Sequence, residues 1–239
     1  MSARHLRIAA FAVVVAAVAF VVAQRQRALS HAAIWPGATL AHVPHLRGSI
    51  TLDGDTDDPG WKGPSLRTGT WVGADGVTPV HPHSEARILW GDGFLYMNLY
   101  AADEDIKALS KSNDSVSADE DSFHVVFTDA TTERSFDFTP LGLVTDAIRP
   151  RGSTTPPDRS WDSHVHVSHE MDGTANDPKD NDEEWVLEIA IPFESLGLLG
   201  AAGERIGLAM HRCDVLRKGP RVCGAWGEVV REVLVLDPP

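Results

Sequence analysis

The sequence has little positive charge. Its 239 residues contain 21 Lys and Arg against 34 Asp and Glu, which gives a formal net charge of −13. A protein that binds nucleic acid without sequence specificity needs a basic surface to displace counterions from phosphates. An anionic membrane surface attracts basic segments for a similar electrostatic reason. The charge therefore argues against both partners and suits a neutral or cationic ligand better.

The sequence also lacks the common catalytic signatures. It has no Gly-x-Ser-x-Gly elbow, no His-Glu-x-x-His pair and no glycine-rich phosphate loop. Glycoside hydrolysis needs two carboxylates that flank one cleft. Glu188 is expected on a strand, and nothing in the sequence marks a partner for it. We therefore expect a protein that binds a ligand and is not an enzyme.

No long segment shows helical periodicity. Instead, short runs alternate apolar and polar residues with a period of two, which is typical of strands. Gly91-Asp92-Gly93 separates two of these runs and predicts a hairpin, and a single helical turn is expected at 193–196. The pattern predicts an all-β protein, a sandwich of the immunoglobulin-like or jelly-roll type. The expected strands are 50–52, 86–90, 94–101, 123–127, 136–138, 185–191, 206–210 and 229–236.

One unbroken apolar run, Ile8 to Ala23, lies near the N-terminus and follows two arginines. It is shorter than the roughly 20 residues of a comfortable membrane-spanning helix and suits a signal peptide. An uncleaved signal-anchor helix would look almost the same. We expect residues 1–27 to be a signal peptide or membrane anchor, 28–47 a linker and 48–239 the sandwich domain. The protein is then exported, periplasmic or extracellular, or held in the inner membrane by this segment.

The chain has only two cysteines, Cys213 and Cys223, placed symmetrically about Lys218-Gly219-Pro220. That tripeptide reads as a turn, and a hairpin around it would bring the two side chains opposite each other. We expect a disulfide, because such bonds persist in oxidising compartments. Two free buried thiols are the alternative.

Four segments, in order, resemble family 9 carbohydrate-binding modules: ITLDGD…DPGW (50–61), ARILWGDGFLY (86–96), DSFHVVF (121–127) and WVLEIAIP (185–192). The resemblance covers about residue 48 to the C-terminus. It implies a β-sandwich related to haem-binding sandwich domains of the DOMON type. It also implies non-catalytic binding of poly- or oligosaccharides in systems that break down polysaccharides. No cofactor is then required, although the family contains calcium.

The resemblance also implies where a sugar would bind, and the chain departs from it there. The family holds a sugar between two tryptophans, and these positions correspond to Ala118 and to the loop at 227–228. The glutamate expected on the Asp-Ser strand is His124. The arginine and asparagine expected on the next strand are Asp137 and Thr139. The carbohydrate site is therefore predicted to include His124, Asp137 and Thr139.

Other residues are candidates for replacing the lost clamp and for binding calcium. Trp161 and Trp71 lie in expected loops and can stack on the apolar face of a sugar, although tryptophans of this size are usually mostly buried. Asp53, Asp55 and Asp57 crowd one turn. Calcium prefers several oxygen ligands from such loops, so this turn is the candidate calcium site.

Two alternatives to carbohydrate binding stay open. An electron-transfer domain would bind haem b through methionine and histidine, with Met97, Met210, His124 and His211 as candidates. A sandwich that has lost its sugar clamp would instead serve as a scaffold for another envelope protein.

Overall fold

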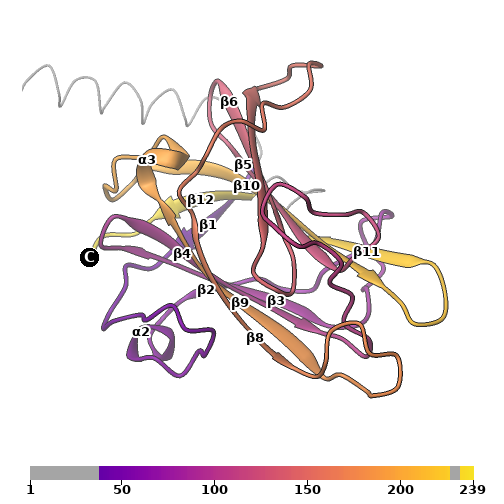
Figure 1. Cartoon of the computed structure of the whole chain (residues 1–239). Helices are drawn as coiled ribbons and strands as arrows, with labels where there is room; N and C mark the ends of the chain where they lie inside the picture. Colours follow the sequence, from indigo (N-terminus) through magenta and orange to yellow (C-terminus); the bar gives the residue numbers. More distant parts are fainter. Residues whose placement is uncertain (1–37, 227–231) are drawn as a thin grey trace, which may run out of the picture. The chain divides into compact units, whose positions relative to one another are not determined.

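The computed structural model describes residues 38–226 and 232–239, and these form two β-sheets with two short helices (Figure 1). One sheet has seven strands in the order β1-β12-β10-β5-β6-β7, with β11 also paired to β10; the other has five in the order β2-β3-β4-β9-β8. The strands are β1 (Thr39–Val43), β2 (Leu66–Arg67), β3 (Ser84–Gly91), β4 (Phe94–Ala102), β5 (Ser122–Thr128), β6 (Thr132–Phe138), β7 (Val144–Pro150), β8 (His166–Asp172), β9 (Glu184–Pro192), β10 (Arg205–Val215), β11 (Arg221–Trp226) and β12 (Glu232–Leu236); the helices are α2 (Pro59–Lys62) and α3 (Phe193–Leu196).

The hairpin between β3 and β4 shows how local sequence sets the register. Gly91 pairs with Phe94, so the turn contains only Asp92 and Gly93. Both have positive φ, 51° and 91°, as a two-residue turn of type I′ requires. Asp-Gly is a favoured pair there because aspartate tolerates, and glycine readily adopts, the left-handed region. The predicted hairpin is confirmed.

The main core lies between the two sheets. Leu95, Met97 and Leu99 of β4 are fully buried, and so are Phe123 and Phe127 of β5. Alternate residues of a strand point to the same face, so the period of two in the sequence becomes the inner lining of the sandwich. The predicted two-sheet, all-β fold is confirmed.

The five-stranded sheet is covered on its other face as well. Leu89 and Tyr96, which alternate with the inner residues, form a second cluster with Trp61 of α2 and with Leu46. The segment between β1 and β2 therefore packs across this sheet. This explains why both faces of β4 are apolar or aromatic in the sequence.

Two expectations about the start of the domain are wrong. Residues 50–52, expected as a strand, form no strand because this segment crosses the outside of the five-stranded sheet and does not join it. Residues 39–43, expected within a linker, form β1, which pairs in parallel with β12. Only two of the five β1 residues are buried, Ala41 and Val43, which is too short an alternation to mark a strand.

The remaining local predictions concern the helical turn, the cysteines and the N-terminus. The turn after Pro192 is present as α3. Cys213 and Cys223 are directly opposite each other in β10 and β11 and form the predicted disulfide. In the part of the chain that the structure describes, no helix is long and apolar enough to cross a membrane. The predicted signal or anchor segment, 1–27, lies outside the described residues.

Candidate functional site

A row of polar side chains lies on the outer face of the seven-stranded sheet. The pairing of β10 with β5 and of β5 with β6 makes His211, His124 and Asp137 direct neighbours across three strands. Met210 and Phe136, which precede two of them in sequence, are fully buried in the core. Because side chains alternate along a strand, the polar row faces away from the core. The side chains of His124 and Asp137 are 40% and 32% exposed, so a ligand in solution can reach them.

The polar row has a defined geometry. The Nδ1 atom of His124 and the Oδ1 atom of Asp137 are 2.6 Å apart, a short hydrogen bond. The ring centroids of His124 and His211 are 6.0 Å apart. On the same face, Arg221 donates a hydrogen bond to the Ser122 hydroxyl over 3.1 Å. The face therefore holds donors and acceptors in fixed positions, as recognition of a polar ligand requires.

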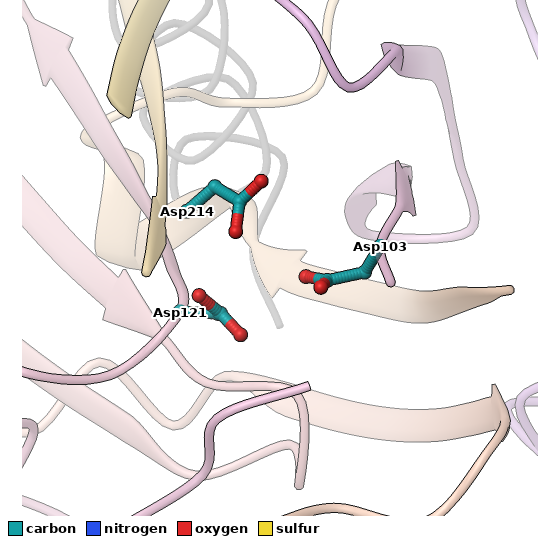
Figure 2. Close-up of side chains that lie close together, drawn as sticks. All are labelled: Asp103, Asp121 and Asp214. Atoms are coloured by element: carbon teal, nitrogen blue, oxygen red, sulfur yellow. The ribbon is translucent and has the colours of Figure 1, made fainter. Parts of the chain in front are cut away.

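A second polar group is buried at one end of the sandwich, where three aspartates converge (Figure 2). Asp103 follows β4, Asp121 precedes β5 and Asp214 lies near the end of β10. A carboxylate oxygen of each lies within 4.8 Å of those of the other two. All three continue the inward-facing alternation of their strands, as Leu99 and Ala101 do before Asp103. The ends of three strands thus place three acids between the sheets.

Backbone and indole groups hold two of these carboxylates. Asp121 accepts hydrogen bonds from the backbone N–H groups of Lys107 and Val215, both over 2.6 Å. Asp103 accepts one from the indole N–H of Trp185 over 3.2 Å. These bonds fix the carboxylates on the inner side of the sheets.

One cation lies beside the three acids. The Nη2 atom of Arg212 is 2.9 Å from a carboxylate oxygen of Asp103 and 3.7 Å from one of Asp214. Its side chain is only 4% exposed, and its Nε atom has no hydrogen-bond partner. One guanidinium thus pairs with two of the three buried carboxyl groups.

The surroundings change the ionisation of this cluster. Burial raises the pKa of Asp121 to about 8, and repulsion from Asp103 adds to the rise. Burial also raises the pKa of Asp214 to about 6, although the charge of Arg212 acts in the opposite direction. Burial is the largest cause of both shifts, and repulsion from neighbouring carboxylates adds to each.

A cavity of about 570 Å³ borders the cluster. Asp105 is buried and lines it. One of its carboxylate oxygens forms an ion pair with the Nζ atom of Lys107 over 2.7 Å, and the other lies 3.6 Å from the Nε atom of Arg217. The cavity is also lined by His81, Pro82, Asp103, Glu104, Asp214, Leu216, Arg217 and Lys218.

No protein-family profile matches the sequence, and no curated protein matches it. Solved structures do match. A proposed carbohydrate-binding protein of Bacteroides uniformis is 10% identical with a TM-score of 0.63, and the match covers 84% of this chain and 100% of that one. A family 9 carbohydrate-binding module of Caldicellulosiruptor kristjanssonii in complex with cellotriose is 13% identical with a TM-score of 0.54, covering 84% and 95%. The complex of a family 9 module of the same organism with glucose is 12% identical with a TM-score of 0.51, covering 83% and 96%.

The fold is that of a family 9 carbohydrate-binding module. At 10–13% identity the similarity establishes the architecture and not the ligand.

On this family 9 fold, the residues expected at the sugar site separate. His124 and Asp137 are neighbours on the outer face, as described above. Thr139 lies beyond the end of β6 and is fully buried, and its hydroxyl accepts a hydrogen bond from the backbone N–H of Leu143 over 3.2 Å. Its inclusion in the site is therefore wrong, because its buried hydroxyl is hydrogen-bonded within the turn after β6 and does not face a ligand.

The two tryptophans proposed to replace the clamp lie on the inner side of the family 9 sandwich. Trp71 is 3% exposed and packs edge-on against Phe123, so it has no free face for a sugar. Trp161 is partly exposed, but its ring contacts Phe136 with 6.0 Å between centroids and packs against the core. Phe136 and Asp137 are consecutive and point to opposite faces of β6. Trp161 therefore lies across the sheet from the polar row.

The acidic turn predicted to bind calcium is a structural turn. Asp53 and Asp55 each accept a hydrogen bond from the backbone N–H two residues later, as aspartate commonly does in turns. The backbone N–H groups of Asp53 and Gly54 donate to the buried carboxylate of Glu188. The carboxylates of Asp53, Asp55 and Asp57 do not converge; among the described residues, only the Asp103 cluster does.

The sequence carried a signal for this cluster that was not recognised. Asp103 and Asp121 each lie one inward step beyond an apolar alternation, as in Leu99, Ala101 and Asp103, whereas Asp214 follows Arg212 on the inner face of β10. An acid at such a position must be buried or end the strand. The three strand ends would indicate a shared polar cluster only once the pairing of the strands was known.

Proposed function

We propose that this chain is a non-catalytic module that binds a poly- or oligosaccharide on the outer face of the seven-stranded sheet. The observation that carries the proposal is the His211–His124–Asp137 row, which lies on the sheet where the resemblance expects polar contacts to a sugar. A partly exposed carboxylate and an imidazole fixed by a hydrogen bond suit the hydroxyl groups of a sugar.

The predicted affinity is modest. Stacking of an aromatic ring on a sugar contributes much of the binding in proteins of this type. Ala118 stands at one position of the clamp, and the other position, at 227–228, lies outside the described residues. The proposed site therefore relies on hydrogen bonds more than on stacking.

We propose further that the protein is exported, to the periplasm or the cell exterior, and serves polysaccharide breakdown there. The disulfide between Cys213 and Cys223 supports export, because such bonds persist in oxidising compartments. The apolar run from Ile8 to Ala23 supports a signal peptide or an inner-membrane anchor.

The haem alternative receives no support from the fold. Met97 and Met210 are fully buried within the core between the sheets. His211 follows Met210 on β10 and points to the opposite face. A haem iron bound to Met210 on the inner face therefore could not also reach His211 without a change in the register of β10.

Affinity electrophoresis through gels that contain a panel of soluble polysaccharides tests the carbohydrate proposal. We expect one or more gels to retard the protein, and His124→Ala and Asp137→Ala to weaken this retardation at least several-fold. His164→Ala is the matched control, because that side chain is 70% exposed outside the row. If His124→Ala and Asp137→Ala are both retarded as strongly as the wild type, the outer face of the seven-stranded sheet is not the binding site. No retardation in any gel would refute the function and direct attention to an envelope protein partner.

We also propose that the aspartate cluster binds calcium. Its donor set fits, because three buried carboxylates within 4.8 Å are the hard oxygen ligands that calcium prefers. Asp103, Asp121 and Asp214 would hold the ion, and the ion would neutralise charge that Arg212 leaves unbalanced.

Thermal unfolding in EDTA and in calcium tests this second proposal. Calcium at about 100 times its Kd should raise Tm by roughly 5–10 °C. Asp121→Asn, which preserves shape, should remove most of this rise, and Asp57→Asn in the exposed acidic turn should not. An unchanged Tm on adding calcium would refute the site.

A further inference from the structure

Two histidines face each other across neighbouring strands of the seven-stranded sheet. His124 of β5 and His211 of β10 are direct partners in an antiparallel register. Such partners place their Cβ atoms about 4.5–5.5 Å apart on the same face. The sheet therefore presents two imidazoles side by side, from strands whose backbones are fixed by hydrogen bonds.

The separation of the rings suits a shared metal ion. Their centroids are 6.0 Å apart, with 58° between the ring planes. A zinc–nitrogen bond is about 2.0–2.1 Å long, so a bound ion lies roughly 3 Å from each ring centroid. Two imidazoles that share one ion therefore have centroids up to about 6 Å apart, and this pair lies within that reach.

A carboxylate orients the first of these rings. The Nδ1 atom of His124 is 2.6 Å from Oδ1 of Asp137. Metal-binding histidines almost always donate their other ring N–H to a carboxylate, a carbonyl or water, which fixes the tautomer and makes the metal-binding nitrogen more basic. With Nδ1 bound to Asp137, Nε2 of His124 is the nitrogen that can bind a metal.

We propose that His124 and His211 form a binding site for a divalent transition metal, with Asp137 as the residue that positions His124. Imidazole suits zinc, copper and nickel, whereas carboxylates and carbonyls suit calcium and magnesium. The pair is therefore chemically distinct from the buried aspartate cluster. His124 and His211 are the two protein ligands assigned among the described residues.

This inference does not depend on carbohydrate binding, because its test uses the metal alone. The protein is first treated with EDTA and then kept in excess calcium, which saturates the oxygen-rich cluster. Zinc binding is measured by titration calorimetry, and the electron paramagnetic resonance spectrum of bound Cu²⁺ reports the number of coordinating nitrogens. We expect one Zn²⁺ per chain, and two nitrogens on Cu²⁺.

Variants separate a ligand from a structural role. His124→Ala and His211→Ala should each weaken zinc binding at least tenfold, and Asp137→Asn should weaken it about 10- to 100-fold. His166→Ala is the matched control, because that histidine lies on β8 of the other sheet and should leave binding unchanged. Circular dichroism verifies that each variant is folded. Absence of zinc binding at 1 mM, or full binding in both histidine variants, would overturn the proposal.

Discussion

Replacement of Arg212 by leucine tests how the buried acids are stabilised. The guanidinium is 2.9 Å from Asp103 and 3.7 Å from Asp214, and all three side chains are at most 5% exposed. Removal of one partner from a buried ion pair leaves an uncompensated charge and costs about 3–5 kcal/mol. We therefore expect Arg212→Leu to lower the free energy of unfolding by that amount at pH 8.5 in EDTA.

The pH dependence of this loss identifies its cause. The raised pKa values of Asp121, about 8, and Asp214, about 6, mean that both carboxyls are largely neutral at pH 5. The arginine then has less negative charge to balance, so the loss at pH 5 should be clearly smaller than at pH 8.5. A loss of packing alone would be the same at both values.

Urea unfolding followed by tryptophan fluorescence measures the free energy at each pH. Arg67→Leu is the matched control, since Arg67 is 53% exposed in its ion pair with Glu85, and exposed pairs contribute at most about 1 kcal/mol. A loss below 1 kcal/mol at pH 8.5 would refute the reasoning. An equal loss at pH 5 and pH 8.5 would refute the electrostatic cause.

Three further predictions concern the same fold. Cys213→Ser with Cys223→Ser should cost about 2–3 kcal/mol in urea unfolding, because the bond closes a loop with a sequence separation of 10; a reductant that leaves the wild-type midpoint unchanged would contradict this. Glu188→Ala should cost about 2–3 kcal/mol, because it leaves the indole N–H of Trp61 and the backbone N–H of Gly54 without their buried acceptor, and a shift in Trp61 fluorescence should accompany the loss. In EDTA the wild-type protein should lose stability from pH 5 to pH 8.5. The pKa values of Asp121 and Asp214 in the folded protein are raised above the unfolded value of 3.8, and stability is lost as the pH rises through these folded pKa values. Chemical unfolding at several pH values checks this, and a free energy of unfolding that rises from pH 5 to pH 8.5 would contradict it.

The sequence predicted those parts of the fold whose signals are local. The hairpin at Asp92-Gly93 follows from backbone preferences at two residues, and the alternation in β4, β5 and β9 follows from burial of one or both faces. The disulfide was predicted from symmetry about a turn, and β10 and β11 place the two cysteines opposite each other. These features depend on few residues and needed no knowledge of the other sheet.

The parts that were missed depend on contacts distant in sequence. β1 is a strand because β12, almost 200 positions later, pairs with it. Thr139 and Trp71 were assigned to a binding site by position in the chain, whereas a turn and the core contain them. His211 joins His124 only through the register of β10 with β5. Such neighbours cannot be read from one sequence, because strand pairing decides them.

The alternation along β10 has a consequence for how this protein can change over evolution. His211 and Cys213 belong to one face of the sheet, and Arg212 and Asp214 belong to the other. Insertion or deletion of one residue within β10 would exchange the two sets, burying an imidazole and exposing the arginine. A substitution in β10 affects either the histidine pair on the outer face or the aspartate cluster on the inner face, whereas a change in the length of β10 would disrupt both. Relatives of this chain should therefore vary in residue type along β10 but keep its length, with insertions confined to the turn before Arg221.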